Sequence, residues 1–244
     1  MGALRERLRD DSGVSLIELM VVMILSAVIM AMIVPFYVTV AMKTTQSNDI
    51  RESTAEASNI MNVVSTTVRA SVDIPVNPPD PSNPPPPIPA IKKGSAVEVV
   101  VTSYTDAGPT FPVPLQIRYY VDATGHMIEQ RWVAQGCDIN LPSACKVAYP
   151  VYPSITSTPQ AERTIGNLVV NRGGCAAGDP SCTSEPLFTY FAADRTTQLG
   201  LAPSGLTAAE LDQVAFVRFD LKVRASDSGK VIALDNIVGM PNVN

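Results

Sequence analysis

The chain has 244 residues, a formal net charge of −5 at pH 7, 46% hydrophobic residues and 17% charged residues. This length fits one sizeable domain or two small ones, and the composition excludes a wholly disordered protein. The acidic balance disfavours nucleic-acid binding by the whole surface, although it leaves a local basic patch open. His126 is the one histidine, which disfavours hydrolytic triads and histidine-ligated metal sites.

The excess of hydrophobic residues lies near the amino terminus. Residues 19–42 carry no charge, and as a helix they would rise about 36 Å, enough for a hydrocarbon core of about 30 Å. A secretory signal has a shorter apolar stretch, followed by small residues at its cleavage site. We therefore expect residues 14–42 to form a membrane-spanning helix, preceded by a polar leader of residues 1–13 without net charge.

Two polar features interrupt the apolar segment. A lone carboxylate in a spanning helix costs about 2.5–3.5 kcal/mol, so Glu18 indicates a function with a charged partner. The alternative is that Glu18 lies at the headgroup boundary and stays hydrated. Pro35 lacks a backbone donor and predicts either a simple kink or a point where the helix melts locally. The sequence leaves these alternatives open.

The start of the segment, GVSLIE at residues 13–18 followed by LMVVMILSAVIMAMIVP, resembles the prepilin signal of type IV pilins and type II secretion pseudopilins. The resemblance implies cleavage after Gly13 by a prepilin peptidase and methylation of the new amino terminus at Val14. It also implies assembly roles for Glu18, the acidic residue at the fifth mature position, and for Pro35. Two features depart from the family, which most often has Phe in place of Val14 and a net basic leader.

Simple electrostatics gives the Glu18 carboxylate a partner. Cleavage would leave a charged amine on Val14, about one helical turn from Glu18. In a filament of packed helices, the amine of one subunit can neutralise Glu18 of its neighbour, and this pairing offsets a desolvation penalty that neither charge would tolerate alone. We expect the pair to set the axial register of the subunits.

A helical rhythm continues through residues 43–74 as a narrow apolar stripe. This pattern predicts an amphipathic half of the same helix, which packs against a globular domain and extends to about residue 72. The stripe consists of Ile50, Ala57, Met61, Val64 and Val68.

Nine prolines within residues 75–89 end this helix. The segment 75–93 is expected to be an extended linker or exposed loop, which we favour over a ligand for a proline-binding module.

Residues 94–244 show the short alternating runs of an extracytoplasmic β-rich head. A glycine turn at residues 123–125 predicts a hairpin, and Thr207 with Glu210 predicts the capping box of a short helix. A long helix on a mostly antiparallel sheet is an α+β, type IV pilin-like fold, and we expect Trp132 to fill the core between them. The strands are expected at residues 96–103, 115–122, 126–134, 168–171, 187–192, 214–225 and 230–235.

A weaker resemblance covers the head. The hairpin QIRYYVDATGHMIEQRWVA and the ending TAAELDQVAFVRFDLKVRA look like the heads of minor pilins of the pilus W type or the secretion J type. This resemblance implies a minor pilin.

The head contains four cysteines, Cys137, Cys145, Cys175 and Cys182. An even number in an oxidising compartment indicates disulfides, with three connectivities open. The short separations favour two local pairs, Cys137–Cys145 and Cys175–Cys182. A tetrathiolate zinc site is the disfavoured alternative, because zinc knuckles space their ligands more closely. We expect no metal and no cofactor.

Other chemistry has little support in the sequence. His126 follows a turn glycine, where stabilisation of the turn is favoured over catalysis, and no P-loop, GxSxG or HExxH motif occurs. Some basic residues could line up if their strands were adjacent, although a solvated face is favoured. They are Arg118, Arg131, Arg218, Lys222 and Arg224.

We therefore expect a non-enzymatic pilin or pseudopilin subunit, anchored once in the cytoplasmic membrane with its amino terminus inside. Its expected partners are prepilin peptidase, other pilin subunits and a pilus or secretion assembly platform, and it would end in an extracellular filament or pseudopilus. Two alternatives stay open: a membrane-anchored module that binds DNA or a surface ligand, and an anchored enzyme.

Overall fold

A computed structural model describes residues 15–74, 87–105, 113–135, 151–173, 175, 179, 182–200, 204–226 and 228–241. By its contacts the chain divides into two compact units, Met1–Asn48 and Asp49–Asn244. The predicted leader, most of the proline-rich segment and the Cys137–Cys145 loop lie outside the described residues.

Helix α1 runs from Leu16 to Arg69, 54 residues, and contains Pro35 in its interior. This agrees with the long helix predicted up to about residue 72. The predicted stripe is buried in its second half, where Ala57, Met61 and Val68 are covered and Ile50 is half-buried.

A five-stranded antiparallel sheet follows, in the order β1-β2-β3-β4-β5. The predicted hairpin is confirmed as β3–β4, and Gly125 occupies the left-handed region at φ 91°, which glycine adopts without a Cβ clash. The strands are β1 (Ile91–Gly94), β2 (Glu98–Thr105), β3 (Val113–Val121), β4 (Met127–Val133) and β5 (Ala161–Gly166).

The second sheet has four antiparallel strands in the order β7-β6-β8-β9. The short helix α2 (Ala208–Leu211) precedes β8, as the capping pattern predicts. The Glu210 carboxylate accepts hydrogen bonds from the backbone N–H and the hydroxyl of Thr207, at 2.8 and 2.7 Å. The strands are β6 (Phe188–Phe191), β7 (Gln198–Leu199), β8 (Phe216–Arg224) and β9 (Val231–Gly239).

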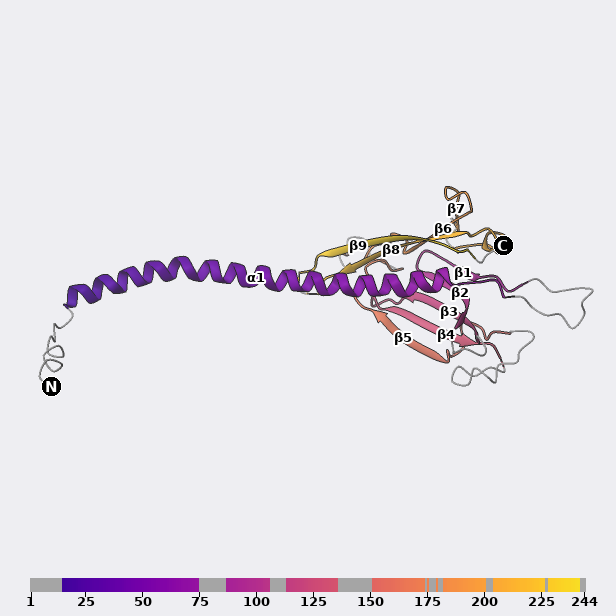
Figure 1. Cartoon of the computed structure of the whole chain (residues 1–244), viewed down its shortest axis with the longest axis horizontal. Coiled ribbons are helices and arrows are strands. Elements are labelled where there is room, and N and C mark those ends of the chain that lie inside the picture. The colour runs from indigo at the N-terminus through magenta and orange to yellow at the C-terminus, as the bar shows by residue number, and fades with distance from the viewer. Residues whose placement is uncertain are drawn as a thin grey trace, which may run out of the picture. The chain divides into compact units, whose positions relative to one another are not determined.

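The second half of α1 lies between the two sheets of the head (Figure 1). Its apolar side chains join both inner sheet faces in one core, in which the rings of Phe188 and Phe219 stack 5.1 Å apart. The α+β class with a long helix and antiparallel sheets is therefore confirmed, and it is consistent with a type IV pilin-like fold.

Several local expectations need correction. Residues 168–171 form isolated bridges instead of a strand, because Leu168 adopts a left-handed φ of 56° that interrupts extended backbone. Residues 91–93 belong to β1 and not to a linker. Strand β5 was missed because its sequence, AERTIG, has no apolar alternation.

Trp132 is fully buried, but it lies on the sheet face that points away from α1. Tyr119 faces the helix, since its hydroxyl lies 2.9 Å from Thr67 Oγ1, and Tyr119 is paired with Glu129. Alternation along β4 places Trp132 on the opposite face from Glu129. There its indole N–H donates to the carbonyl of Ser157 at 3.3 Å, so the loop before β5, and not α1, covers the ring.

Candidate functional site

The first turn of α1 carries the charge that the sequence singles out. The Glu18 backbone N–H lies 3.4 Å from Ser15 Oγ, an N-cap arrangement that satisfies one orphan donor of the helix start. A carboxylate in the first turn also suits the positive end of the helix dipole. Gly13 and Val14 lie outside the described residues, so the predicted amine partner of Glu18 has no described position.

The first unit presents apolar side chains on every side of the helix. Leu16, Met32 and Phe36 are each exposed over more than 70% of their surface. Of the helices in the described residues, α1 is the one long and apolar enough to cross a membrane, and none of its most apolar stretch is buried in the protein. A surface of this kind needs lipid or other apolar helices around it.

Pro35 lies within this apolar stretch, and α1 continues through it. Because proline has no backbone N–H, the carbonyl of Ala31 loses its usual helical donor. One turn later, the Thr39 hydroxyl donates to the carbonyl of Pro35 at 2.8 Å, a contact that often accompanies helix bending. The arrangement suits either alternative for Pro35, a simple kink or a point of local melting.

The second half of α1 is tied to the head by polar contacts at its two ends. Buried Asp49 accepts hydrogen bonds from the Ser226 hydroxyl at 3.1 Å and the Ser228 backbone N–H at 2.7 Å. Farther along the helix, Ser65 Oγ accepts from Asn236 Nδ2 at 3.0 Å. These contacts align the β8–β9 hairpin with the helix.

A buried carboxylate lies between α1 and the five-stranded sheet. The Glu129 side chain is 1% exposed and accepts from Tyr119 Oη at 2.8 Å and from Arg163 Nη2 at 2.9 Å, with a further bond from Arg131. Burial alone would raise the pKa of Glu129, but these hydrogen bonds outweigh it and hold the pKa below its ordinary value. Burial and the Glu129 charge raise the pKa of Tyr119.

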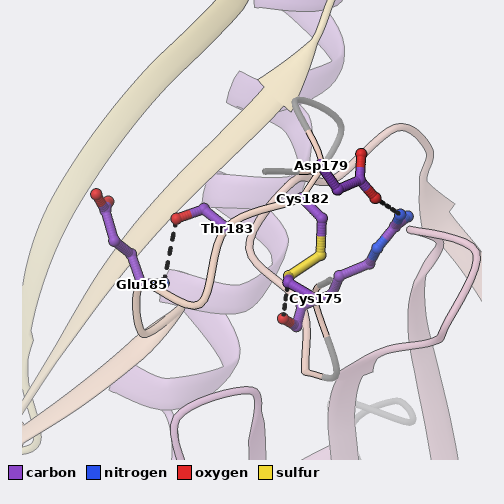
Figure 2. Close-up of a disulfide and its surroundings, with 6 residues drawn as sticks. Cys175, Asp179, Cys182, Thr183 and Glu185 are labelled. Carbon is purple, nitrogen blue, oxygen red and sulfur yellow. Dashed lines mark hydrogen bonds and ion pairs between the residues drawn. A yellow bond between two sulfur atoms is a disulfide. The ribbon is translucent and has the colours of Figure 1, made fainter. Parts of the chain in front are cut away.

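The structure joins Cys175 to Cys182, one of the two local pairs that the spacing favours. Figure 2 shows the disulfide with Asp179 beside it, whose carboxylate lies 3.8 Å from the guanidinium of Arg172. Because the disulfide takes two of the four sulfurs, the tetrathiolate zinc alternative is wrong. In the described part of the chain, no cluster of three or more metal-ligating side chains is found.

His126 stabilises the β3–β4 turn. Its backbone N–H donates to Asp122 Oδ1 at 2.8 Å, and its Nδ1 lies 3.2 Å from Asp122 Oδ2. Burial alone would raise the pKa of Asp122, but hydrogen bonds from Thr124 and His126 lower it to about 2. These contacts fit the turn role that the sequence favours.

The five basic residues considered for a stripe do not lie in one sheet. Arg118 and Arg131 belong to the five-stranded sheet, and the other three belong to the four-stranded sheet. Arg118 pairs with Glu98 at 2.6 Å, and Lys222 pairs with Glu185. Acidic partners also neutralise Arg131 and Arg218. The disfavoured alternative, one basic stripe across adjacent strands, is therefore wrong.

Comparison with known families decides what the amino terminus is. A family model described as the prokaryotic N-terminal methylation motif matches residues 8–34. The chain carries a type IV prepilin-like leader motif. The matched residues include Gly13, Val14 and Glu18, end just before Pro35, and do not extend into the head. No match was found among curated proteins.

The motif supports a type IV pilin- or pseudopilin-type protein. It implies processing by prepilin peptidase and assembly with other pilins at the membrane. Together with the apolar helix, the leader supports membrane anchoring.

The sequence patterns did not predict the three carboxylates that are buried in the described part of the second unit, Asp49, Glu98 and Glu129. Strict alternation along β4 could have placed Glu129 on the same sheet face as Met127 and Val133, where a carboxylate needs cationic partners. Asp49 gives a weaker signal, because its position one turn before Ser53 continues a buried face that is polar at this end.

Proposed function

We propose that this chain is a subunit of a type IV pilus or pseudopilus, cut after Gly13, methylated at Val14 and assembled through α1. The observation that carries the proposal is the methylation motif at residues 8–34, placed at the start of an apolar helix with no protein cover. A soluble protein would bury such a helix, whereas a filament subunit exchanges lipid for neighbouring helices.

In this proposal Glu18 neutralises the amine that cleavage creates on a neighbouring subunit. Glu18 lies in the first turn of α1, so a chain that begins at Val14 carries both charges at one end of its helix. The paired charges stabilise one axial register, since every other register leaves a carboxylate in an apolar surrounding. The subunit has no catalytic role.

The finer proposal is a minor subunit, at or near a filament tip. It is supported by the proline-rich insert in residues 75–89 and by the loops of the head, one of which is closed by the Cys175–Cys182 disulfide. Extra loops would crowd the packing of a regular helical shaft. In this proposal the amino terminus lies on the cytoplasmic side of the membrane and the head on the outer side. Labelling of the head on intact filaments tests this position, and a uniform label along the whole length would contradict it.

The proposed processing is tested by mass spectrometry of the amino terminus of the mature chain in host cells. We expect a chain that begins at methylated Val14. Gly13→Val should block cleavage, because a branched side chain replaces hydrogen at the scissile residue, whereas Gly2→Val makes the same change within the leader but outside the matched motif. An intact Met1 in the wild-type chain would contradict the proposal and leave an ordinary signal-anchor protein.

A further inference from the structure

Among the described residues, strand β9 is an edge of its sheet, and one row of its backbone groups has no strand partner. In the described residues it pairs with β8 alone. The Met240 N–H donates to the Ala215 carbonyl, and the Ala225 N–H donates to the Lys230 carbonyl. These bonds fix the register, so even-numbered residues of β9 point their backbone groups toward β8. The residues that point theirs away from the sheet are Val231, Ala233, Asp235, Ile237 and Gly239.

This edge has little of the usual protection against pairing, since its one charged side chain, Asp235, lies 3.7 Å from the guanidinium of Arg218 on β8. Its nine-residue register has no bulge, and β9 contains neither lysine nor proline, the residues that guard natural edges. Val231 and Ile237 are 45% and 56% exposed, and they are two of the four large apolar side chains exposed in the described head. On the helix-facing side, Leu234 is half-buried, although its partner Leu221 on β8 is fully buried.

Strand β9 runs in the same direction as the second half of α1. Asp49 of the helix contacts Ser228, just before β9 begins. Ser65, sixteen residues farther along the helix, contacts Asn236 in the second half of the strand. The lengths of the two segments agree, because helix residues 49–65 rise about 1.5 Å each and residues 228–236 rise about 3.3 Å each.

The opposite edge of the head is β5, which pairs with β4 alone among the described strands. The Asp122 N–H donates to the His126 carbonyl. It follows that the backbone N–H and C=O groups of even-numbered residues of β4 point toward β3, and those of odd-numbered residues point toward β5. Since Arg163 is the partner of Glu129, Glu162 and Thr164 point their backbone groups away from the sheet.

Strand β5 runs opposite to α1. The end of the strand lies at the earlier part of the helix, where Glu56 accepts a hydrogen bond from the Asn167 N–H at 2.6 Å. Arg163, near the strand start, reaches Thr67 through the Glu129 and Tyr119 side chains. Strands β9 and β5, each an edge among the described strands, therefore run in opposite directions relative to α1.

We propose that β9 of one subunit pairs with β5 of a second copy of this chain, which joins the two sheets across the subunit boundary. The proposal rests on the proposed function, in which neighbouring subunits assemble with their α1 helices in the same direction. Under that condition β9 and β5 of neighbouring copies meet antiparallel, the geometry that suits free edges. Antiparallel pairing of β9 with β9 would require the helices to run in opposite directions.

The side chains favour one register over a shift that would bring Asp235 opposite Glu162. With Asp235 opposite Thr164 of the second copy, both side chains lie on the outer faces and can hydrogen bond. Leu234 then lies opposite Ile165, and both are half-buried apolar residues at the margin of the core. A shift of two residues would place Asp235 opposite Glu162, and like charges directly opposite each other are unfavourable.

The register is tested by disulfide crosslinking of full-length chains in host cells. One tagged copy carries Asp235→Cys and a differently tagged copy carries Thr164→Cys. Directly opposed residues in a hydrogen-bonded pair have Cα atoms about 5.5 Å apart, within the range of a disulfide. We expect a mixed dimer. The matched control pairs Ala233→Cys with Thr164→Cys, a diagonal about 7–8 Å apart, and should crosslink about tenfold less. Chains with native cysteines alone supply the blank.

A second variant removes the proposed hydrogen bonds without touching β8. Ala233→Pro deletes an outward N–H, and edge strands tolerate proline at such positions; Ala233→Ser keeps the N–H. In the Asp235→Cys chain, Ala233→Pro should lower the mixed dimer about tenfold and Ala233→Ser should leave it unchanged. Fluorescence of buried Trp132 checks that the head stays folded.

The outcomes separate the two proposals. If chains begin at methylated Val14 and assemble, yet both cysteine pairs crosslink equally or not at all, the edge pairing is overturned and the proposed function stands. Adducts of Asp235→Cys with a different protein alone would also overturn the assignment to a second copy. If the chains keep Met1 and do not assemble, the proposed function falls and the edge pairing falls with it.

Discussion

The two halves of α1 use one helix in opposite ways. In residues 16–48 the large apolar side chains are exposed on every side, as at Ile29, which is 54% exposed. In the second half a stripe that includes Ile60 is fully buried among two sheets. The first half therefore has helical order without tertiary partners in the chain, whereas the second half is part of a folded core.

This difference shows where each kind of partner is needed. The backbone hydrogen bonds of a helix are satisfied internally, so the first half is complete in lipid or among other helices. The second half carries buried polar residues, such as Asp49 and Ser65, whose bonds require the head. We expect changes in the first half to alter assembly and changes in the second half to alter folding.

The largest expected effect is that of Glu18→Ala on assembly. The variant should still insert and be cut after Gly13, but the neighbouring amine at Val14 would lose its counter-charge. Loss of one member of a buried pair costs roughly 3–5 kcal/mol, so the assembled fraction should fall by about a hundredfold or more. The measurement compares sheared filaments with membrane-retained chain by quantitative immunoblot.

Glu52→Ala is the matched control for Glu18→Ala, because Glu52 is an exposed acid in the second half of the same helix. It should assemble like the wild type. Normal assembly of Glu18→Ala would contradict the pairing and leave Glu18 as a hydrated headgroup residue.

The same substitution, isoleucine to alanine, made in each half of α1 tests whether the two halves differ in their contribution to folding. Ile60→Ala opens a cavity in the core and should lower the free energy of unfolding of the head by about 2–5 kcal/mol. Ile29→Ala removes the same atoms where nothing in the chain covers them, and should change it by less than about 0.5 kcal/mol. Urea unfolding of the detergent-solubilised full chain, followed by the fluorescence of Trp132, measures both.

An equal effect of these two variants would break the distinction between the halves. The tryptophan signal suits this purpose, because Trp132 is the one tryptophan in the chain and is fully buried in the head.

The disulfide should stabilise the head alone. Replacement of Cys175 and Cys182 by serine opens a short loop, whose closure is worth about 2–3 kcal/mol. The same unfolding assay should show this loss under oxidising conditions, while membrane insertion stays unchanged. Identical stability of the double variant and the wild type would show that the loop is held by its other contacts, such as that between Arg172 and Asp179.

Sequence pattern predicts the elements whose physics is local. The apolar run and its 3.6-residue continuation predict α1, and the glycine turn predicts the β3–β4 hairpin. The leader motif is local too, and it places Gly13, Val14 and Glu18 without any structure. Strand β5 was not predicted from the sequence, because pairing with β4, and not its own composition, makes it extended.

The remaining errors concern which partner a correctly placed side chain meets. The burial of Trp132 follows from its size, but its sheet face depends on the pairing of Tyr119 with Glu129. The sequence left a basic stripe open as an alternative, because the order of strands within and between sheets is not encoded in charge spacing. The buried network at Glu129 needs contacts from β3, β5 and α1 at once, which no single window of sequence contains.

The smallest expected effect tests how this network joins the head to α1. Glu129→Gln keeps the shape but weakens bonds from Arg163 and Arg131, and should lower the free energy of unfolding at pH 7 by about 1–2 kcal/mol. The pKa of Glu129 is lowered in the folded protein from its ordinary 4.5. The carboxylate therefore stabilises the fold above pH 4.5 and loses this effect as the pH falls below 4.5 through the lower folded pKa. The difference between wild type and variant should shrink over that acid range.

Glu162→Gln, at an exposed position on the neighbouring strand, should show a smaller difference. A difference for Glu129→Gln that stays constant from pH 7 to pH 3 would mean that its ionised form contributes nothing to the packing of α1 against the sheet.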